Sequence, residues 1–140
     1  MKVQDIMTAN VVCISDGATI KDAHLLMQSR GVRHLPVISE ADGILVGLLT
    51  HKKMIATVVG LLNRYGAGAL DRRERYTPLV ELMETDFTPL TTDTALADVV
   101  DYFISNKHGC LPVVDSERKV LGIVTSSDFV KLCSKLLKDQ

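Results

Sequence analysis

The chain has 140 residues, of which 46% are hydrophobic and 4% aromatic, and it carries a net charge of −1 at pH 7. This length allows one ordinary domain with a buried core, and abundant apolar residues with so little net charge exclude a disordered chain. No apolar run approaches the roughly 20 residues that span a bilayer, and the N-terminus lacks the pattern of a signal peptide. The three cysteines form no CxxC pair, so we expect a cytoplasmic protein without disulfide bonds or membrane contact.

Residues 1–55 predict a unit made of a strand, a helix, a hairpin and a second helix. A short extended segment at residues 11–14 leads to a helix with Thr19 as N-cap and Asp22 in the reciprocal position of a capping box. Gly31 can end this helix in a left-handed conformation. The apolar residues of the helix share one stripe, formed by Ile20, Ala23 and Met27.

Two apolar runs follow, at residues 34–38 and 44–50, and the polar turn between them predicts a hairpin. A second helix, from residue 52 to about residue 65, closes the unit. This helix runs into the segment at residues 56–78, which joins the first unit to the next.

The joining segment combines a helix breaker with an excess of positive charge. Residues 66–68 read Gly-Ala-Gly and should break or bend the helix, and residues 70–76 predict a short charged helix or a loop. From His51 to Arg75 there are six Lys or Arg residues against two acids. Such a stretch can attract phosphate or an acidic partner, or it can be a solvated helix face.

Residues 79–140 predict the same order of elements a second time. An extended segment at residues 87–90 precedes a helix, and runs at 110–114 and 119–125 form a second hairpin. A last helix extends from residue 127 to about residue 137. The apolar stripe of the first helix in this unit is formed by Leu96, Val99, Val100 and Phe103.

The two units are copies of one another. Three blocks match in the same order, namely Asp5-Ile6-Met7 with Glu81-Leu82-Met83, Leu35–Ile38 with Leu111–Val114, and Leu45–Thr50 with Val120–Thr125. The predicted fold class is therefore α/β (α+β), with tandem β-α-β-β-α repeats. A sheet with both helices on one side leaves its other face apolar, so we expect the repeats to pack sheet to sheet with pseudo-twofold symmetry.

The repeated motifs resemble those of the cystathionine-β-synthase (CBS) domain family. They are the start D-I-M, the strands H-L-P-V-I and C-L-P-V-V, and the ending G-I-V-T-S-S-D. The resemblance covers nearly the whole chain and is closest to stand-alone, bacterial-type CBS-pair proteins. It implies that the two repeats form a Bateman module whose cleft holds an adenine nucleotide or adenosyl ligand, and that such modules pair into disc-like dimers.

The second repeat ends its hairpin in a segment suited to a ribose phosphate. Thr125, Ser126 and Ser127 open a helix with free backbone N–H groups, hydroxyls and the positive end of the dipole. Asp128 in the first turn has two oxygens that can accept both hydroxyls of a ribose. The alternative is that Thr125 or Ser126 caps the helix while Asp128 complements its dipole, a role that contributes ~1 kcal/mol.

The first repeat departs from this pattern, because Lys53 stands where the ribose-binding Asp would be. A lysine cannot accept hydrogen bonds from a diol. Thr50 and Lys53 therefore define a second, degenerate site, in which Lys53 either meets a phosphate tail or is an exposed basic residue.

The resemblance also implies that the ligand contacts both repeats. The nucleotide-binding residues carried over from the family are Thr8, Ala9, Asn10, Val11, Val12, Cys110, Leu111, Pro112, Thr125, Ser126, Ser127 and Asp128. The family often has a basic residue near the Cys110 position to hold phosphate, where this chain has Gly109 and Cys110. His108 is a nearby candidate cation, or an ordinary residue at the end of a helix.

Motifs for catalysis and metal binding are absent. No P-loop, dinucleotide turn, H-E-x-x-H or G-x-S-x-G motif occurs, and the histidines and cysteines lack metal-ligand spacing. We therefore expect no enzyme, no metal site and no required cofactor.

The prediction is a regulatory module that senses an adenine nucleotide or adenosyl compound (AMP, ADP, ATP or S-adenosylmethionine) and signals through a protein partner or its assembly state as a homodimer. The alternative is a non-catalytic structural or dimerisation module with a vestigial cleft. Nucleic-acid binding through Arg72, Arg73, Arg75 and Tyr76 is not favoured, because no recognition fold accompanies them.

Overall fold

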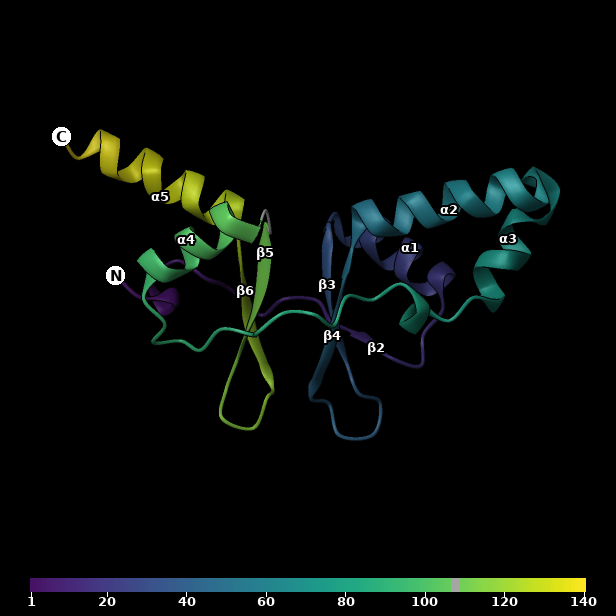
Figure 1. Ribbon diagram of the computed structural model, residues 1–140, viewed down its shortest axis with the longest axis horizontal. Coiled ribbons are helices and arrows are strands. Elements are labelled where there is room, and N and C mark those ends of the chain that lie inside the picture. Colours follow the sequence, from purple (N-terminus) through teal and green to yellow (C-terminus); the bar gives the residue numbers. More distant parts are fainter. Residues whose placement is uncertain (107–108) are drawn as a thin grey trace. The chain divides into compact units, whose positions relative to one another are not determined.

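The computed structural model describes residues 1–106 and 109–140, and the chain divides into two compact units. One unit contains both termini, with residues 1–11 and 87–140, and we call it the terminal unit. The other contains residues 12–86, and we call it the central unit. Figure 1 shows the purple N-terminal segment beside the green and yellow elements of the terminal unit.

The central unit is a three-stranded sheet with two helices on one face and a third helix beyond them. Its elements are β2 (Ile14–Ser15), α1 (Ile20–Arg30), β3 (His34–Ile38), β4 (Leu45–Thr50), α2 (His51–Tyr65), α3 (Ala67–Tyr76) and a short 3₁₀ helix (Leu79–Glu81). The strand order is β2-β3-β4, with β2 parallel and β4 antiparallel to β3. The predicted helices and hairpin strands of the first repeat are present, with ends that agree within one residue, whereas the extended segment predicted at residues 11–14 is shorter and later, at Ile14–Ser15.

Helix α1 begins and ends as its sequence predicts. The backbone N–H of Thr19 donates to Oδ2 of Asp22 at 2.9 Å, and the backbone N–H of Asp22 donates to Oγ1 of Thr19 at 3.3 Å. These reciprocal bonds complete the predicted capping box. Gly31 follows the helix with φ of 64°, in the left-handed region that glycine adopts without steric strain.

The core of the central unit joins both helices to one face of the sheet. Leu35 and Val37 of β3 lie on the same face as Leu49 of β4, which is paired with Leu35. These side chains pack with the α1 stripe and with Met54 of α2. The predicted arrangement of both helices on one side of the sheet is therefore confirmed for this unit.

The joining segment forms a helix of its own. Gly66 has φ of 81° and separates α2 from α3, so the predicted break lies at this glycine. Helix α3 then packs on α1. Glu74 of α3 is only 3% exposed, and its Oε1 lies 2.7 Å from Nδ1 of His24 on α1.

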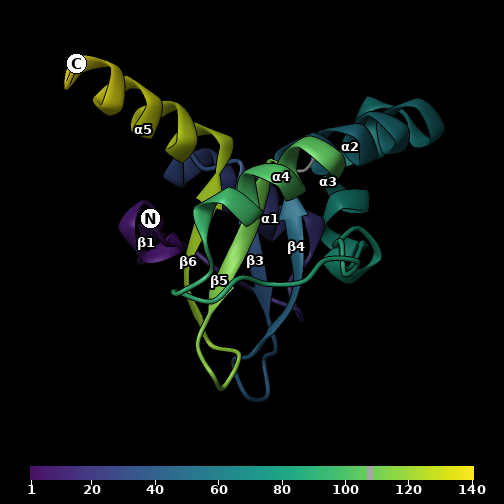
Figure 2. The same ribbon diagram turned by 60° about the vertical axis from the view of Figure 1, so that its left-hand side comes forward.

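The terminal unit repeats this plan with one difference in its sheet. Its elements are a short 3₁₀ helix (Val3–Asp5), β1 (Thr8–Ala9), α4 (Leu96–Asn106), β5 (Cys110–Val114), β6 (Val120–Thr125) and α5 (Ser126–Lys138). The strand order is β1-β6-β5, and Figure 2 shows β1 beside β6. Apolar residues of α4, β5 and β6 form the core, and Phe103 meets Phe129 edge to face with ring centroids 5.8 Å apart.

Each repeat contributes a short segment near its start to the sheet of the other repeat. Residues 8–9, from the first repeat, supply the third strand of the terminal sheet. The predicted strand at residues 87–90 is reduced there to a single bridge between Leu90 and Val113. In the central unit, Glu84 of the second repeat bridges to Leu48 of β4 in the corresponding way. Each repeat therefore completes the sheet edge of the other.

Two glycines at equivalent positions make room for the exchanged segments. A Cβ atom on Gly122 of β6 would overlap the carbonyl oxygen of Thr8. A Cβ atom on Gly47 of β4 would come within 2.6 Å of Sδ of Met83 and 3.2 Å of the carbonyl oxygen of Glu84. Close backbone approach at a strand is a common reason for glycine there.

Candidate functional site

Asp128 lies in the first turn of α5 and is only 6% exposed. Its Oδ2 accepts a hydrogen bond from the backbone N–H of Thr125 at 2.8 Å and another from Oγ1 of Thr125 at 3.3 Å. The first bond satisfies one of the donors that a helix N-terminus leaves unpaired, and the carboxylate sits at the positive end of the helix dipole. Asp128 therefore has the capping role that the sequence offered as an alternative.

The other oxygen of Asp128 is bound from the opposite end of the chain. Oγ1 of Thr8 donates to Oδ1 of Asp128 at 3.0 Å. Pairing of Thr8 with Ile123 on β6 holds Thr8 at this position. Three of the predicted site residues, Thr8, Thr125 and Asp128, are thus brought together around one buried carboxylate.

Cys110 of β5 borders the same carboxylate. It is paired with Thr125 across the hairpin and is 3% exposed. Burial raises the pKa of the Cys110 thiol to about 12, and the negative charge of Asp128 adds to this effect. The thiol therefore stays protonated at neutral pH, which excludes it as a nucleophile there.

The remaining predicted residues differ in burial and are divided between the two units. Leu111 and Pro112 are buried on β5, whereas Ala9 and Asn10 are exposed and Asn10 has φ of 54°. Ser126 and Ser127 are exposed in the first turn of α5. Val11 belongs to the terminal unit, whereas Val12 belongs to the central unit. His108 lies outside the described residues.

This geometry can bind a ligand rich in hydroxyls. A carboxylate has about four lone-pair sites, and Asp128 accepts three hydrogen bonds from the described residues. The Thr8 hydroxyl can itself accept a bond or yield its place to a ligand hydroxyl. The exposed residues Ser126 and Ser127 lie at the start of α5, where the helix dipole favours an anionic group.

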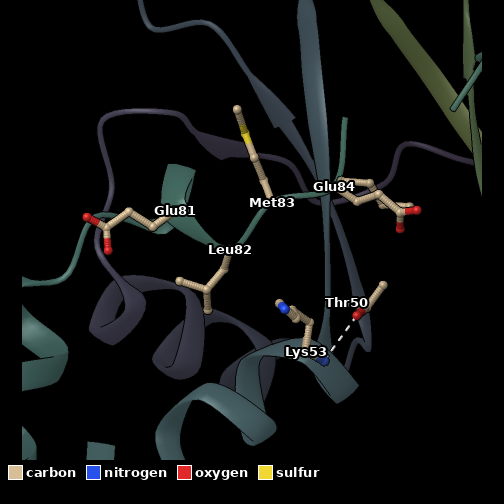
Figure 3. Close-up of a pocket in the computed structure, with 7 residues that line it drawn as sticks. Thr50, Lys53, Glu81, Leu82, Met83 and Glu84 are labelled. Atoms are coloured by element: carbon tan, nitrogen blue, oxygen red, sulfur yellow. Dashed lines mark hydrogen bonds between the residues drawn. The ribbon is translucent and has the colours of Figure 1, made fainter. Parts of the chain in front are cut away.

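The equivalent position in the central unit has a different chemistry. A cavity of about 400 Å³ is lined by Leu48, Thr50, Lys53, Glu81, Leu82, Met83 and Glu84. Figure 3 shows the two glutamates pointing in opposite directions, with the Lys53 side chain between them. Thr50 accepts from the backbone N–H of Lys53 at 3.2 Å, so α2 has only half of the capping box that α5 has.

Sequence reasoning missed the acids of this cavity. Glu84 occupies the position of Thr8 in the repeat, as Lys53 occupies that of Asp128. The hydroxyl-to-carboxylate contact of the terminal unit is thus replaced by a glutamate and a lysine. The signal was present, because Glu84 follows Glu81-Leu82-Met83 just as Thr8 follows Asp5-Ile6-Met7.

A basic hollow also lies beside the N-terminus of α2. Its volume is about 470 Å³, and its lining includes Arg33, His34, His51 and Lys52. Burial lowers the pKa of His34, and the charge of Arg33 lowers it further. His34 occupies the position of Cys110, so the first repeat has an imidazole where the second repeat has a thiol.

Two further classes of site were searched for in the described residues. Across residues 1–106 and 109–140, no three His, Cys, Asp or Glu side chains are grouped to hold a metal ion. Over the same ranges, no helix has both the length and the apolar character needed to cross a bilayer.

The family follows from a match that covers both repeats. The sequence profile of the CBS domain matches residues 3–60 and, again, residues 79–135. The chain belongs to the CBS-domain family. The resemblance seen in its repeated motifs is therefore confirmed, and so is its mixed α/β fold with two three-stranded sheets.

Solved CBS pairs share this fold over almost the whole chain. The AcuB protein of Vibrio cholerae is 32% identical, with a TM-score of 0.82 over 99% of this chain and 95% of that one. The CBS domain pair of protein MJ0100, in complex with 5′-methylthioadenosine and S-adenosyl-L-methionine, is 25% identical, with a TM-score of 0.76 over 96% and 97% of the two chains. CBSX2 in complex with AMP is 26% identical, with a TM-score of 0.78 over 96% and 97%.

Curated CBS relatives in archaea are longer than this chain. It is 30% identical to the uncharacterized protein MJ1225 of Methanocaldococcus jannaschii, covering 92% of this chain and 46% of that protein. It is 31% identical to a homoserine O-acetyltransferase of Methanosarcina acetivorans, covering 95% of this chain but 22% of the enzyme. The chain therefore spans less than half the length of each of these proteins.

Proposed function

We propose that this CBS pair is a regulatory, non-catalytic module that binds an adenine nucleotide or adenosyl compound at the start of α5. The observation that carries the proposal is the buried carboxylate of Asp128, with Thr125 on one oxygen and Thr8 on the other. Support also comes from two CBS pairs of the same fold that bind AMP, or 5′-methylthioadenosine and S-adenosyl-L-methionine.

In this proposal the ribose binds to Asp128 and the serines receive the charged group. A ribose hydroxyl donates to Oδ1 of Asp128 and replaces or joins the Thr8 hydroxyl. The hydroxyl and backbone N–H of Ser127 meet a phosphate or carboxylate, because the N–H groups of Ser126 and Asp128 already donate to Gly109 and Thr125. The base lies against the apolar and backbone groups of β1 and β5, at Ala9, Leu111 and Pro112.

The central cavity is not a second ribose site in this proposal. Lys53 cannot accept a hydrogen bond, and Glu84 adds a negative charge to the same cavity that disfavours a phosphate tail. We therefore expect one nucleoside to bind per chain. Output then passes through a protein partner or through homodimer assembly, and the ligand shifts either equilibrium only by its differential affinity for the two states.

Thermal unfolding with AMP, ADP, ATP, adenosine, 5′-methylthioadenosine and S-adenosyl-L-methionine tests the proposal. A ligand at a hundred times its dissociation constant adds ~2.7 kcal/mol of stability. Asp128→Ala should abolish the response. Because that change also breaks a capping box, Asp22→Ala is the matched control, since it breaks the same kind of box on α1. The control should lose stability but keep the full response, and an unchanged response in Asp128→Ala would disprove the site.

The second candidate is a structural or dimerisation module in which Asp128 only caps α5. The observation that favours it is that Thr125 and Thr8 already bind both oxygens of this carboxylate. In this case no ligand of the series raises the unfolding temperature, and Asp128→Ala and Asp22→Ala lose similar stability. Isothermal titration calorimetry of the parent protein with the same ligands then gives no heat of binding.

A further inference from the structure

Helix α3 lies outside both segments of the chain that match the CBS-domain profile. Those segments are residues 3–60 and 79–135, so residues 61–78 are particular to the join between the repeats. Figure 1 shows α3 turning back from the end of α2. The helix carries three arginines, Arg72, Arg73 and Arg75, and two acids, Asp71 and Glu74.

Both acids of α3 are used to hold the helix on α1. Nζ of Lys21 lies 2.9 Å from Oδ1 of Asp71, and Oδ2 of Asp71 also accepts from Nε of Arg75 at 2.7 Å. Glu74 is buried against His24. Hydrogen bonding to Lys21 and Arg75 lowers the pKa of Asp71. The acids therefore anchor α3 and leave two of its arginines unneutralised.

Each of those two arginines lies near an aromatic ring instead, and Arg73 is stacked directly on its ring. The guanidinium carbon of Arg73 lies 3.5 Å from the ring centroid of Tyr65, and that of Arg72 lies 6.0 Å from the ring centroid of Tyr76. Over residues 1–106 and 109–140, neither arginine forms an ion pair with a carboxylate. A guanidinium that stacks on a ring keeps its N–H edge for planar oxyanions and has less conformational entropy to lose on binding.

Arg72 and Arg73 border an open hollow. Its volume is about 440 Å³, and it is lined by Ala69, Arg72, Arg73 and Tyr76. Tyr76 is 77% exposed, a high value for an aromatic side chain. Exposed tyrosine beside arginine is the composition that protein interfaces favour over other surfaces.

We propose that this α3 surface, formed by Ala69, Arg72, Arg73 and Tyr76, docks an acidic segment of a partner protein. The guanidinium groups of Arg72 and Arg73 can each bind a carboxylate in bidentate geometry, and stacking on Tyr65 preorganises that of Arg73. A nucleic acid fits less well, because it presents one charge per ~1.7 Å and needs a row of cations, whereas the net charge of this chain is −1. Docking at α3 goes beyond nucleotide binding and does not require it.

Fluorescence anisotropy with a short, labelled, glutamate-rich peptide tests the proposal on the full chain. The parent protein should bind the peptide, and added salt should weaken binding because the contact is between exposed charges. The double variant Arg72→Ala/Arg73→Ala should bind at least about tenfold more weakly, as expected for lost charge-assisted hydrogen bonds. Arg72→Lys/Arg73→Lys keeps the charge and should still lose much of the affinity, because lysine neither stacks nor binds in a bidentate way.

The matched control is Lys131→Ala/Lys135→Ala, which removes the same charge from exposed positions on α5. It should bind the peptide as the parent does, and circular dichroism should show that all variants remain folded. Absence of peptide binding by the parent, or equal binding by the parent and Arg72→Ala/Arg73→Ala, would overturn the proposal. Tighter binding of labelled oligothymidine than of the peptide would overturn it in favour of nucleic acid. Each result stands whether or not nucleotides bind at Asp128.

Discussion

Oγ1 of Thr8 donates a hydrogen bond to Oδ1 of Asp128 at 3.0 Å, although 120 residues separate them in the sequence. The bond forms only when β1 is paired with β6, since that pairing holds Thr8 in place. Asp128 thus has one oxygen committed to its own helix and the other to the N-terminal segment. Asp128 can therefore complete the capping box of α5, hold residues 8–9 against β6, and still accept a hydrogen bond from the proposed ligand.

Removal of the Thr8 hydroxyl tests the value of this contact. Thr8→Val keeps the shape of the side chain but leaves Oδ1 of Asp128 without its protein donor, so the free energy of unfolding should fall by about 1 to 2 kcal/mol. Urea unfolding followed by circular dichroism measures the change. Thr88→Val, at an exposed position of the same unit, is the control and should change stability by less than about 0.5 kcal/mol. Equal effects of the two changes would show that the bond contributes nothing.

Lys53→Asp should strengthen the N-terminus of α2. Thr50 already accepts from the backbone N–H of Lys53, so an aspartate there can complete the capping box and also complement the helix dipole. The free energy of unfolding should rise by about 0.5 kcal/mol, because repulsion from the Glu84 carboxylate in the same cavity offsets part of the capping gain. Lys52→Asp makes the same change in charge one position earlier, where it does not complete the box, and should stabilise less. A larger gain from Lys52→Asp would mean that charge alone is responsible.

Gly122→Ala should be destabilising because of the exchanged segment. The added methyl group overlaps the carbonyl oxygen of Thr8, so β1 must move away from β6, at an expected loss of about 1 to 3 kcal/mol. Gly60→Ala is the control. That glycine lies within α2 with no heavy atom within 4 Å of the added methyl group, so it should gain about 0.5 to 1 kcal/mol from helix propensity. Comparable losses in both variants would contradict the close approach of β1.

Stability at high pH should depend on Cys110. Its pKa is raised to about 12 in the folded chain, whereas an unfolded thiol ionises near ~8.5. The folded state therefore binds the proton more tightly, and its contribution is complete below about pH 8.5 and is lost as the pH rises toward 12.

Between those limits, the parent should lose up to about 1.4 kcal/mol per pH unit relative to Cys110→Ala. Urea titrations at a series of pH values measure the two slopes. Cys133 is exposed, so Cys133→Ala should keep the slope of the parent. Parallel curves for the parent and Cys110→Ala would show that the buried thiol does not control stability in this range.

Local sequence signals predicted much of the fold, because most of them act within a few residues. The Thr19–Asp22 capping box and the left-handed Gly31 depend only on backbone chemistry close to them. The two hairpins follow from apolar runs and a turn, and the repeat corroborated each assignment. The Gly66 break between α2 and α3 was visible for the same reason.

Features that depend on contacts distant in sequence were not predicted from local patterns, although the family resemblance grouped residues 8–9 with Thr125 and Asp128 in one site. The exchange of residues 8–9 into the terminal sheet requires knowledge of which strand edge is open, and local patterns do not give it. Glu74 looked like a surface residue of a charged segment, and only the packing of α3 on α1 buries it against His24. At the candidate site, the sequence located Thr125 and Asp128 but gave no means to learn that Thr8 already binds the carboxylate.

The exchange of leading segments also bears on how such a molecule could arise. A chain with a single repeat would have an open edge on its sheet and an N-terminal segment able to pair with such an edge. Within one repeat, however, that segment would not lie next to the open edge of its own sheet. Two such chains could pair both edges by exchanging their N-terminal segments in a dimer. If the repeat is then duplicated within one gene, the exchange between two molecules becomes an exchange between two repeats of the same chain.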